Sequence, residues 1–251
     1  MDHLATCDGL ERELGLMVDA VAAADPAAAV PTCPGWSVRD VVEHTGGVHR
    51  WANGLVADQV QRPTRRPPIE LTATDRTELA AWLADGGRAL LTTLRSASPD
   101  DPMWAWGADQ HVRFWVRRQL HETLIHRVDC ELATGRESLI GPEVASDNID
   151  ELLEIIPRAA PFQPLVDNLR GSDSLHLHAT DAPEGVNGEW LITYHDDGFT
   201  WTHEHGRGSV AVRAPLAELA LLLNRRTRPG ESVEVLGDAS VLDHWIENSA
   251  L

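Results

Sequence analysis

Lysine is absent from this sequence, and all 21 of its basic side chains are arginine. Without lysine the chain cannot form a lysine Schiff base with a carbonyl substrate. It also lacks the lysine that binds nucleotide phosphates in a P-loop. Both kinds of site are therefore excluded.

Positive charge and cysteine are scarce as well. The chain has 39 acidic residues against 21 arginines, and its net charge is −18. Nucleic acids and anionic membrane surfaces attract proteins through basic patches, so this charge argues against both as partners. The three cysteines (Cys7, Cys33 and Cys130) are odd in number and widely spaced. They therefore predict neither a disulfide framework nor a CxxC zinc ribbon.

Long apolar runs are also missing. No stretch approaches 18 apolar residues, so we expect no membrane span. Residues 1–15 lack the basic and apolar regions of a signal peptide, so we expect a cytoplasmic protein. The chain of 251 residues, with 43% hydrophobic and 24% charged residues, can form one large domain or two ordinary ones.

The first half of the sequence predicts four helices. Ser37 followed by Asp40 resembles a capping box, and Gly135 suits the position after a helix end. The helical spacing of apolar residues covers residues 8–24, 38–58, 75–96 and 111–134. Four helices joined by loops predict a four-helix bundle over residues 1–140.

The second half changes character. After one more helix around Ile149–Ile156, polar and apolar residues alternate as they do in strands. The expected strands are 173–181, 189–197, 198–205, 210–215 and 232–238, and the expected helices are 215–226 and 239–248. We therefore expect an α+β domain, a small sheet with helices, over residues 141–251.

The segment HETLIHRVD (121–129) carries four titratable groups within one expected helix. Glu122 and His126 are four residues apart and lie on one helix face, which Asp129 joins, whereas His121 points about 100° away from Glu122. A glutamate and a histidine so placed can share one divalent metal ion. They can equally form a hydrogen-bonded pair or a surface pair, and periodicity does not decide between these alternatives.

The opposite side of the same helix carries Arg117, Arg127 and Glu131. We interpret these three charged residues as the face exposed to solvent. Leu120, Leu124 and Val128 fall within or beside this face, however, so packing of the helix on two sides is the alternative. If this face is exposed, Glu122 and His126 point inward, where buried polar groups need a partner or a metal ion to offset the loss of solvation.

A third metal ligand would have to come from another helix. The second helix offers His44 and His49, which diverge because they are five residues apart, and the helical wheel does not separate them. Two histidines and one carboxylate leave coordination positions open, as catalytic sites do.

The expected strands offer a second group of histidines. His176 and His178 share one strand face, and His203 and His205 do the same in the HEH segment. They are a second candidate for a metal site. Because these histidines alternate with other residues, we favour the interpretation that they are parts of a solvated sheet face.

Two long motifs link these residues to a known family. They are PTCPGWSVRDVVEHTGGVHRWA (31–52) and LHETLIHRVDCELATG (120–135), followed by LLLNRR and VEVLGDASVLDHW in the second half. Together they resemble the mycothiol-dependent maleylpyruvate isomerase family over nearly the whole chain. The resemblance implies a DinB-like four-helix bundle at residues 1–140 and the family's C-terminal α+β domain at 141–251.

The resemblance also implies a site. The family pattern places a divalent metal, usually zinc, on His44, Glu122 and His126. It places an arginine of the C-terminal domain near the metal, and of the two arginines in LLLNRR we select Arg226. Asp129 is the natural acceptor for the second N–H of a metal-bound histidine.

The activity implied by the resemblance is thiol chemistry. Metal coordination deprotonates a thiol, so mycothiol would act as a thiolate cosubstrate that isomerises or conjugates a small electrophile. One alternative is a metal-dependent hydrolase without a thiol cofactor, and another is a non-catalytic ligand-binding or sensor module on the same bundle. A monomer and a homodimer are both compatible with the sequence.

Overall fold

The computed structural model describes residues 1–230 and 232–249. The chain divides into two compact units, Met1–Ser138 and Leu139–Leu251. Within the described ranges, no helix is long and apolar enough to span a membrane.

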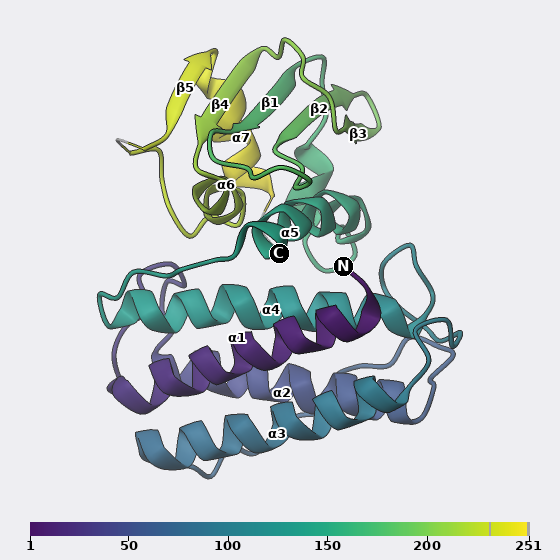
Figure 1. Ribbon diagram of the computed structural model, residues 1–251, viewed down its shortest axis with the longest axis vertical. Coiled ribbons are helices and arrows are strands. Elements are labelled where there is room, and N and C mark those ends of the chain that lie inside the picture. Colours follow the sequence, from purple (N-terminus) through teal and green to yellow (C-terminus); the bar gives the residue numbers. More distant parts are fainter. Residues whose placement is uncertain (231, 250–251) are drawn as a thin grey trace. The chain divides into compact units, whose positions relative to one another are not determined.

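The first unit is a four-helix bundle (Figure 1). Its helices are α1 (His3–Ala23), α2 (Val38–Ala57), α3 (Arg76–Ser96) and α4 (Val112–Ala133). Helix α1 packs against α3 and α4, and α2 packs against the same two helices, so the four close around one core. The predicted bundle is confirmed.

Local sequence signals set the helix ends. The Ser37 side chain accepts a hydrogen bond from the Asp40 amide, and the Asp40 carboxylate accepts one from the Ser37 amide, which completes the predicted capping box of α2. Gly135 has a positive φ of 68°, a conformation that glycine adopts without strain after a helix end.

The charged side of α4 differs from the prediction. Arg127 and Glu131 are buried, so the interpretation of this side as solvent-exposed is wrong. Arg127 Nε donates to Glu13 of α1 at 2.6 Å, and its Nη1 donates to Glu131 at 2.6 Å. These mutual ion pairs offset the cost of removing the three charges from water, which allows α4 to be buried on this side too.

The second unit is an α+β domain, as predicted. Its helices are α5 (Pro142–Ile155), α6 (Leu216–Leu223) and α7 (Ala239–Asn248), with short 3-10 turns at Ile156–Arg158 and Pro164–Asn168. Its strands are β1 (Ser174–Ala179), β2 (Glu189–His195), β3 (Gly198–Thr202), β4 (Val210–Ala214) and β5 (Glu234–Gly237). Helices α6 and α7 pack against the central strands β1 and β4 (Figure 1).

The strands form one sheet in the order β3-β2-β1-β4-β5, in which only the β1–β4 pair is parallel. Apolar residues of β1, β2 and β4 face a core that all three helices complete, and this core includes Leu177, Trp190 and Val212. The alternate residues lie on the other face, and His176, His178 and Glu189 are among them.

The HEH segment lies outside the sheet. Strand β3 ends at Thr202, so the prediction that His203 and His205 share one strand face is wrong. His203 bonds to Asp150 of α5 on the helical side, whereas His205 bonds to Glu189. His176 is itself buried rather than solvated.

Candidate metal centre

Helices α2 and α4 bring three potential metal ligands together. One ligand atom each from His44, Glu122 and His126 lies within 4.8 Å of the other two. Nε2 of His44 is 2.9 Å from Oε1 of Glu122, and Nε2 of His126 is 3.3 Å from the same oxygen. Each of the three side chains keeps some access to solvent, so an ion can reach them.

Asp129 binds the ring nitrogen of His126 that does not face Glu122. Its Oδ2 accepts a hydrogen bond from Nδ1 of His126 at 2.9 Å, and its side chain is fully buried. With its proton on Nδ1, the imidazole turns the lone pair of Nε2 toward His44 and Glu122. This is the tautomer that a metal ligand requires.

The loop before α2 is attached to this same carboxylate. The Thr32 hydroxyl donates to Asp129 Oδ1 at 2.5 Å, and the Cys33 thiol lies 3.4 Å from Oδ2. A carboxylate therefore lies beside Cys33, which the sequence analysis did not detect. Gly35, two residues on, has a φ of 85°, so the turn in PTCPGW depends on glycine.

Charge at the centre favours a cation. Burial disfavours the Glu122 carboxylate, but hydrogen bonds from His126 and His44 and the charges of His126 and Arg118 hold its pKa well below the usual range. Burial opposes the charge of His126 as well, yet its bonds to Asp129 and Glu122 raise the pKa of the imidazole. The two carboxylates thus hold positive charge at the position where a metal ion would supply it.

The structure separates the other histidines from this group. His49, the alternative ligand, is fully buried, and its Nε2 lies 2.8 Å from the hydroxyl of Thr123. Neither His49 nor the buried His121 belongs to the group of converging ligand atoms in the described part of the chain.

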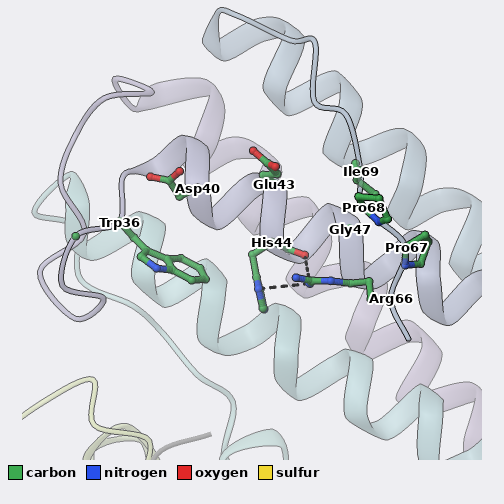
Figure 2. A pocket seen from close by; sticks show the side chains of 10 residues that line it. Trp36, Asp40, Glu43, His44, Gly47, Arg66, Pro67, Pro68 and Ile69 are labelled. Atoms are coloured by element: carbon green, nitrogen blue, oxygen red, sulfur yellow. Dashed lines mark hydrogen bonds between the residues drawn. The ribbon is translucent and has the colours of Figure 1, made fainter. Parts of the chain in front are cut away.

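A pocket of about 720 Å³ opens beside His44 (Figure 2). Trp36 forms one wall, with its ring 5.2 Å from that of His44. On the other side, Arg66 donates to the carbonyl of His44 at 3.3 Å and approaches its Nδ1 at 3.5 Å. Sequence analysis did not identify either residue as part of the site. The concentration of arginines in the loop that contains Arg66 was the available signal.

Arg226, predicted near the metal, belongs to the second unit. It follows α6, and its Nη1 donates to the carbonyl of Asn224 at 2.8 Å. Its role at the metal centre stays a prediction.

Replacing Asp129 by asparagine is expected to weaken zinc binding about 10–100-fold, because the neutral amide is a weaker acceptor for Nδ1 of His126 than the carboxylate and fixes its tautomer less firmly. Competition with a coloured chelator measures the affinity. Glu43→Gln removes the same charge at the pocket rim and should leave the affinity nearly unchanged. Equal zinc affinities of Asp129→Asn and the unmodified protein would contradict the role of Asp129 in orienting His126.

His49 is expected to make stability depend on pH. Burial lowers its pKa to about 4, below the value of about 6.5 in an unfolded chain. The unfolded state therefore binds more protons between these values, and stability present above pH 6.5 is lost as the pH falls toward 4. Between pH 7 and pH 5 the contribution of His49 amounts to about 2 kcal/mol. Urea unfolding of the zinc-free protein measures the free energy of unfolding at pH 7 and at pH 5. The fall between these two values should be smaller by that amount in His49→Gln. An equal fall in His49→Gln and the unmodified protein would contradict a lowered pKa of His49.

Both parts of the chain match known protein families. Residues 7–131 match the mycothiol maleylpyruvate isomerase N-terminal domain, and residues 143–244 match the MDMPI C-terminal domain. No curated protein sequence matches the chain.

Two solved structures share the fold. A crystal structure of a histidine-to-alanine mutant of the mycothiol-dependent maleylpyruvate isomerase is 12% identical, with a TM-score of 0.63 over 94% of this chain and 93% of that one. A crystal structure of the mycothiol-dependent maleylpyruvate isomerase itself is 13% identical, with a TM-score of 0.56 over the same shares. The domain matches, in this order and over both units, establish that the chain belongs to the mycothiol-dependent maleylpyruvate isomerase family.

Proposed function

We propose that this protein is a zinc-dependent enzyme that uses the thiol of mycothiol to isomerise or conjugate a small electrophile. The observation that carries the proposal is the convergence of His44, Glu122 and His126 beside an open pocket. Family membership supports mycothiol as the thiol, although at this sequence identity the solved relatives support only the fold.

The donor set fits a catalytic zinc ion. Two imidazole nitrogens and one carboxylate are common zinc ligands, and three protein ligands leave a position for a cosubstrate. Zinc bound there would lower the pKa of a thiol from about 8.5, so that the thiolate predominates at neutral pH.

The surrounding residues would keep these ligands in place. Asp129 fixes the tautomer of His126, as described above. Arg118 donates to Oε2 of Glu122 at 3.0 Å, which leaves Oε1 directed toward the two histidines. Ligands held in this way need little rearrangement when the ion binds.

The pocket is lined by one arginine, Arg66, and by two carboxylates, Asp40 and Glu43, so a substrate carboxylate would bind at its Arg66 end. Its volume falls in the range of about 300–1,000 Å³ that is usual for small-molecule sites. The guanidinium of Arg66 lines it beside His44 and can bind a carboxylate in two-point fashion. We therefore favour an electrophile that carries a carboxylate. We also propose Arg226, the arginine that the family resemblance places near the site, as a catalytic residue.

Turnover of maleylpyruvate tests the proposal, and the disappearance of the cis isomer measures it. Isomerisation should require both zinc and mycothiol, and mass spectrometry of mycothiol adducts detects conjugation with other electrophiles. Arg226→Ala should raise KM or lower kcat, and Arg225→Ala is its matched control.

The rival functions predict different results. A hydrolase would turn over esters or amides with zinc in thiol-free buffer. A sensor module would bind a ligand and release no product even with mycothiol present. Either result, without any thiol-dependent product, would overturn the proposal.

A further inference from the structure

A second cluster of histidines lies in the α+β unit, whereas the bundle ligands belong to the first unit. It gathers around Glu189 on the sheet face opposite the helices. Nε2 of His176 donates to Oε2 of Glu189 at 2.6 Å, while Nδ1 of His178 and Nδ1 of His205 approach Oε1 at 2.5 and 3.1 Å.

We propose that His176, Glu189 and His205 form a second zinc site, and that His178 holds Glu189 in position for it. Ligand atoms of the first three residues all lie within 4.8 Å of one another. In a tetrahedral zinc site with bonds of 2.0–2.2 Å, ligand atoms lie roughly 3.4 Å apart. Small side-chain rotations therefore suffice to admit an ion.

The sheet holds two of these ligands rigidly. His178 pairs directly with Glu189 in the antiparallel β1–β2 register, and His176 is two residues away on the same face of β1. Side chains that are opposite or diagonal across two strands are close neighbours. Since β1 is the middle strand of the sheet, its backbone cannot move without breaking pairs on both sides.

Strand order brings the third ligand to the same place. Strand β3 lies at one edge, and β4 lies beyond β2 and β1, so residues 203–209 have to cross both strands. A Cβ at Gly206 would lie 2.8 Å from Leu191, and a Cβ at Gly208 only 2.6 Å from a backbone oxygen. These glycines therefore allow the crossing segment to lie close against the sheet, with His205 above His176.

The chemistry of the cluster favours zinc. The Glu189 carboxylate accepts hydrogen bonds from three imidazoles, so it lies at the centre of the cluster. The rings of His176 and His205 meet edge to face with their centroids 4.9 Å apart, and each ring directs one nitrogen at Glu189. Nitrogen-rich sets of this kind suit zinc rather than magnesium or calcium.

The ligands of this cluster also differ in their exposure to solvent. The side chain of His176 is 5% exposed, whereas that of His205 is 76% exposed. An ion can therefore enter from solvent and would attach the crossing segment to β1 and β2. We expect bound zinc to stabilise the second unit, because it ties together segments that are free in the unfolded chain.

Zinc content of the full chain tests this proposal. The protein is stripped with a chelator, reloaded with zinc, dialysed and measured by mass spectrometry. The unmodified protein should hold about two zinc ions per chain, and His205→Ala and Glu122→Gln about one each. The double variant should hold none. His195→Ala removes another exposed strand histidine and should leave the content at about two.

The design separates this site from the bundle site. Because His205 is exposed, its replacement should leave the fold intact, which the near-ultraviolet circular dichroism spectrum checks. In a chain that already carries Glu122→Gln, adding His178→Ala should weaken zinc binding at least 10-fold. Zinc content that His205→Ala leaves unchanged would overturn the second site, whatever Glu122→Gln does. If Glu122→Gln loses zinc and His205→Ala does not, the proposal of the bundle site stands and the proposal of the second site fails.

Discussion

Glu122→Gln is expected to remove zinc from the bundle and to lower thiol-dependent turnover by roughly 1,000-fold or more, the loss of several kcal/mol of stabilisation of the transition state. Glu122 is the residue that links the two histidines, because His44 and His126 both contact its Oε1. The neutral amide keeps the shape of the side chain but loses the charge that attracts the metal. Zinc content and kcat/KM, measured on the same preparations, check the result.

Glu137→Gln is the matched control for this experiment. Glu137 is exposed just beyond the end of α4, so its replacement changes the net charge equally without touching the cluster. It should keep full zinc content and turnover. Full turnover by Glu122→Gln would contradict a role for this carboxylate in the reaction.

Arg127→Met is expected to destabilise the bundle by about 3–5 kcal/mol, because it leaves two buried carboxylates without their cation. Arg127 is 1% exposed and contacts Glu13 of α1 and Glu131 of α4. Burial is also the main reason that the pKa of Glu13 is raised, even with the arginine present. Urea unfolding followed by tryptophan fluorescence measures the change.

Two further variants make this prediction specific. Arg113→Met removes an exposed arginine that pairs with Asp100 and Asp109, and it should cost no more than about 1 kcal/mol. Replacing all three buried charges together (Glu13→Leu, Arg127→Met and Glu131→Leu) should recover most of the lost stability, since no unpaired charge remains. A loss in Arg127→Met no larger than that in Arg113→Met would contradict the account.

The fold was largely predictable because its signals are local. The capping box at Ser37 and the glycine at position 135 each act within one turn of a helix, so the sequence contains everything needed to place them. The alternation in residues 173–195 likewise marks β1 and β2. Strand order was not predictable in this way, because the β1–β4 pairing joins segments more than thirty residues apart.

Burial of charge could not be predicted from the helical wheel. The wheel shows that Arg127 and Glu131 share a side of α4, but not that Glu13 of α1 faces them. A partner from another helix turns an apparently solvated side into a buried one. The same limit applied to His205, whose position depends on how the chain crosses the sheet.

The candidate site was predictable only where its residues are close in the sequence. Glu122 and His126 are neighbours through helical spacing alone, whereas the choice between His44 and His49 depends on how α2 faces α4. The structure brings His44 to the pair and turns His49 toward Thr123. Attachment of Thr32 to Asp129 likewise joins residues far apart in the chain.

The central claim is that a thiol cosubstrate coordinates a metal held by the bundle. Cobalt substitution followed by titration with mycothiol tests it most directly, because thiolate coordination gives cobalt an intense charge-transfer absorption near the ultraviolet. The His205→Ala background confines the signal to the bundle if both zinc sites exist. A saturable absorption band that needs mycothiol and disappears with Glu122→Gln is the result we predict. A cobalt spectrum unchanged by saturating mycothiol would contradict the claim.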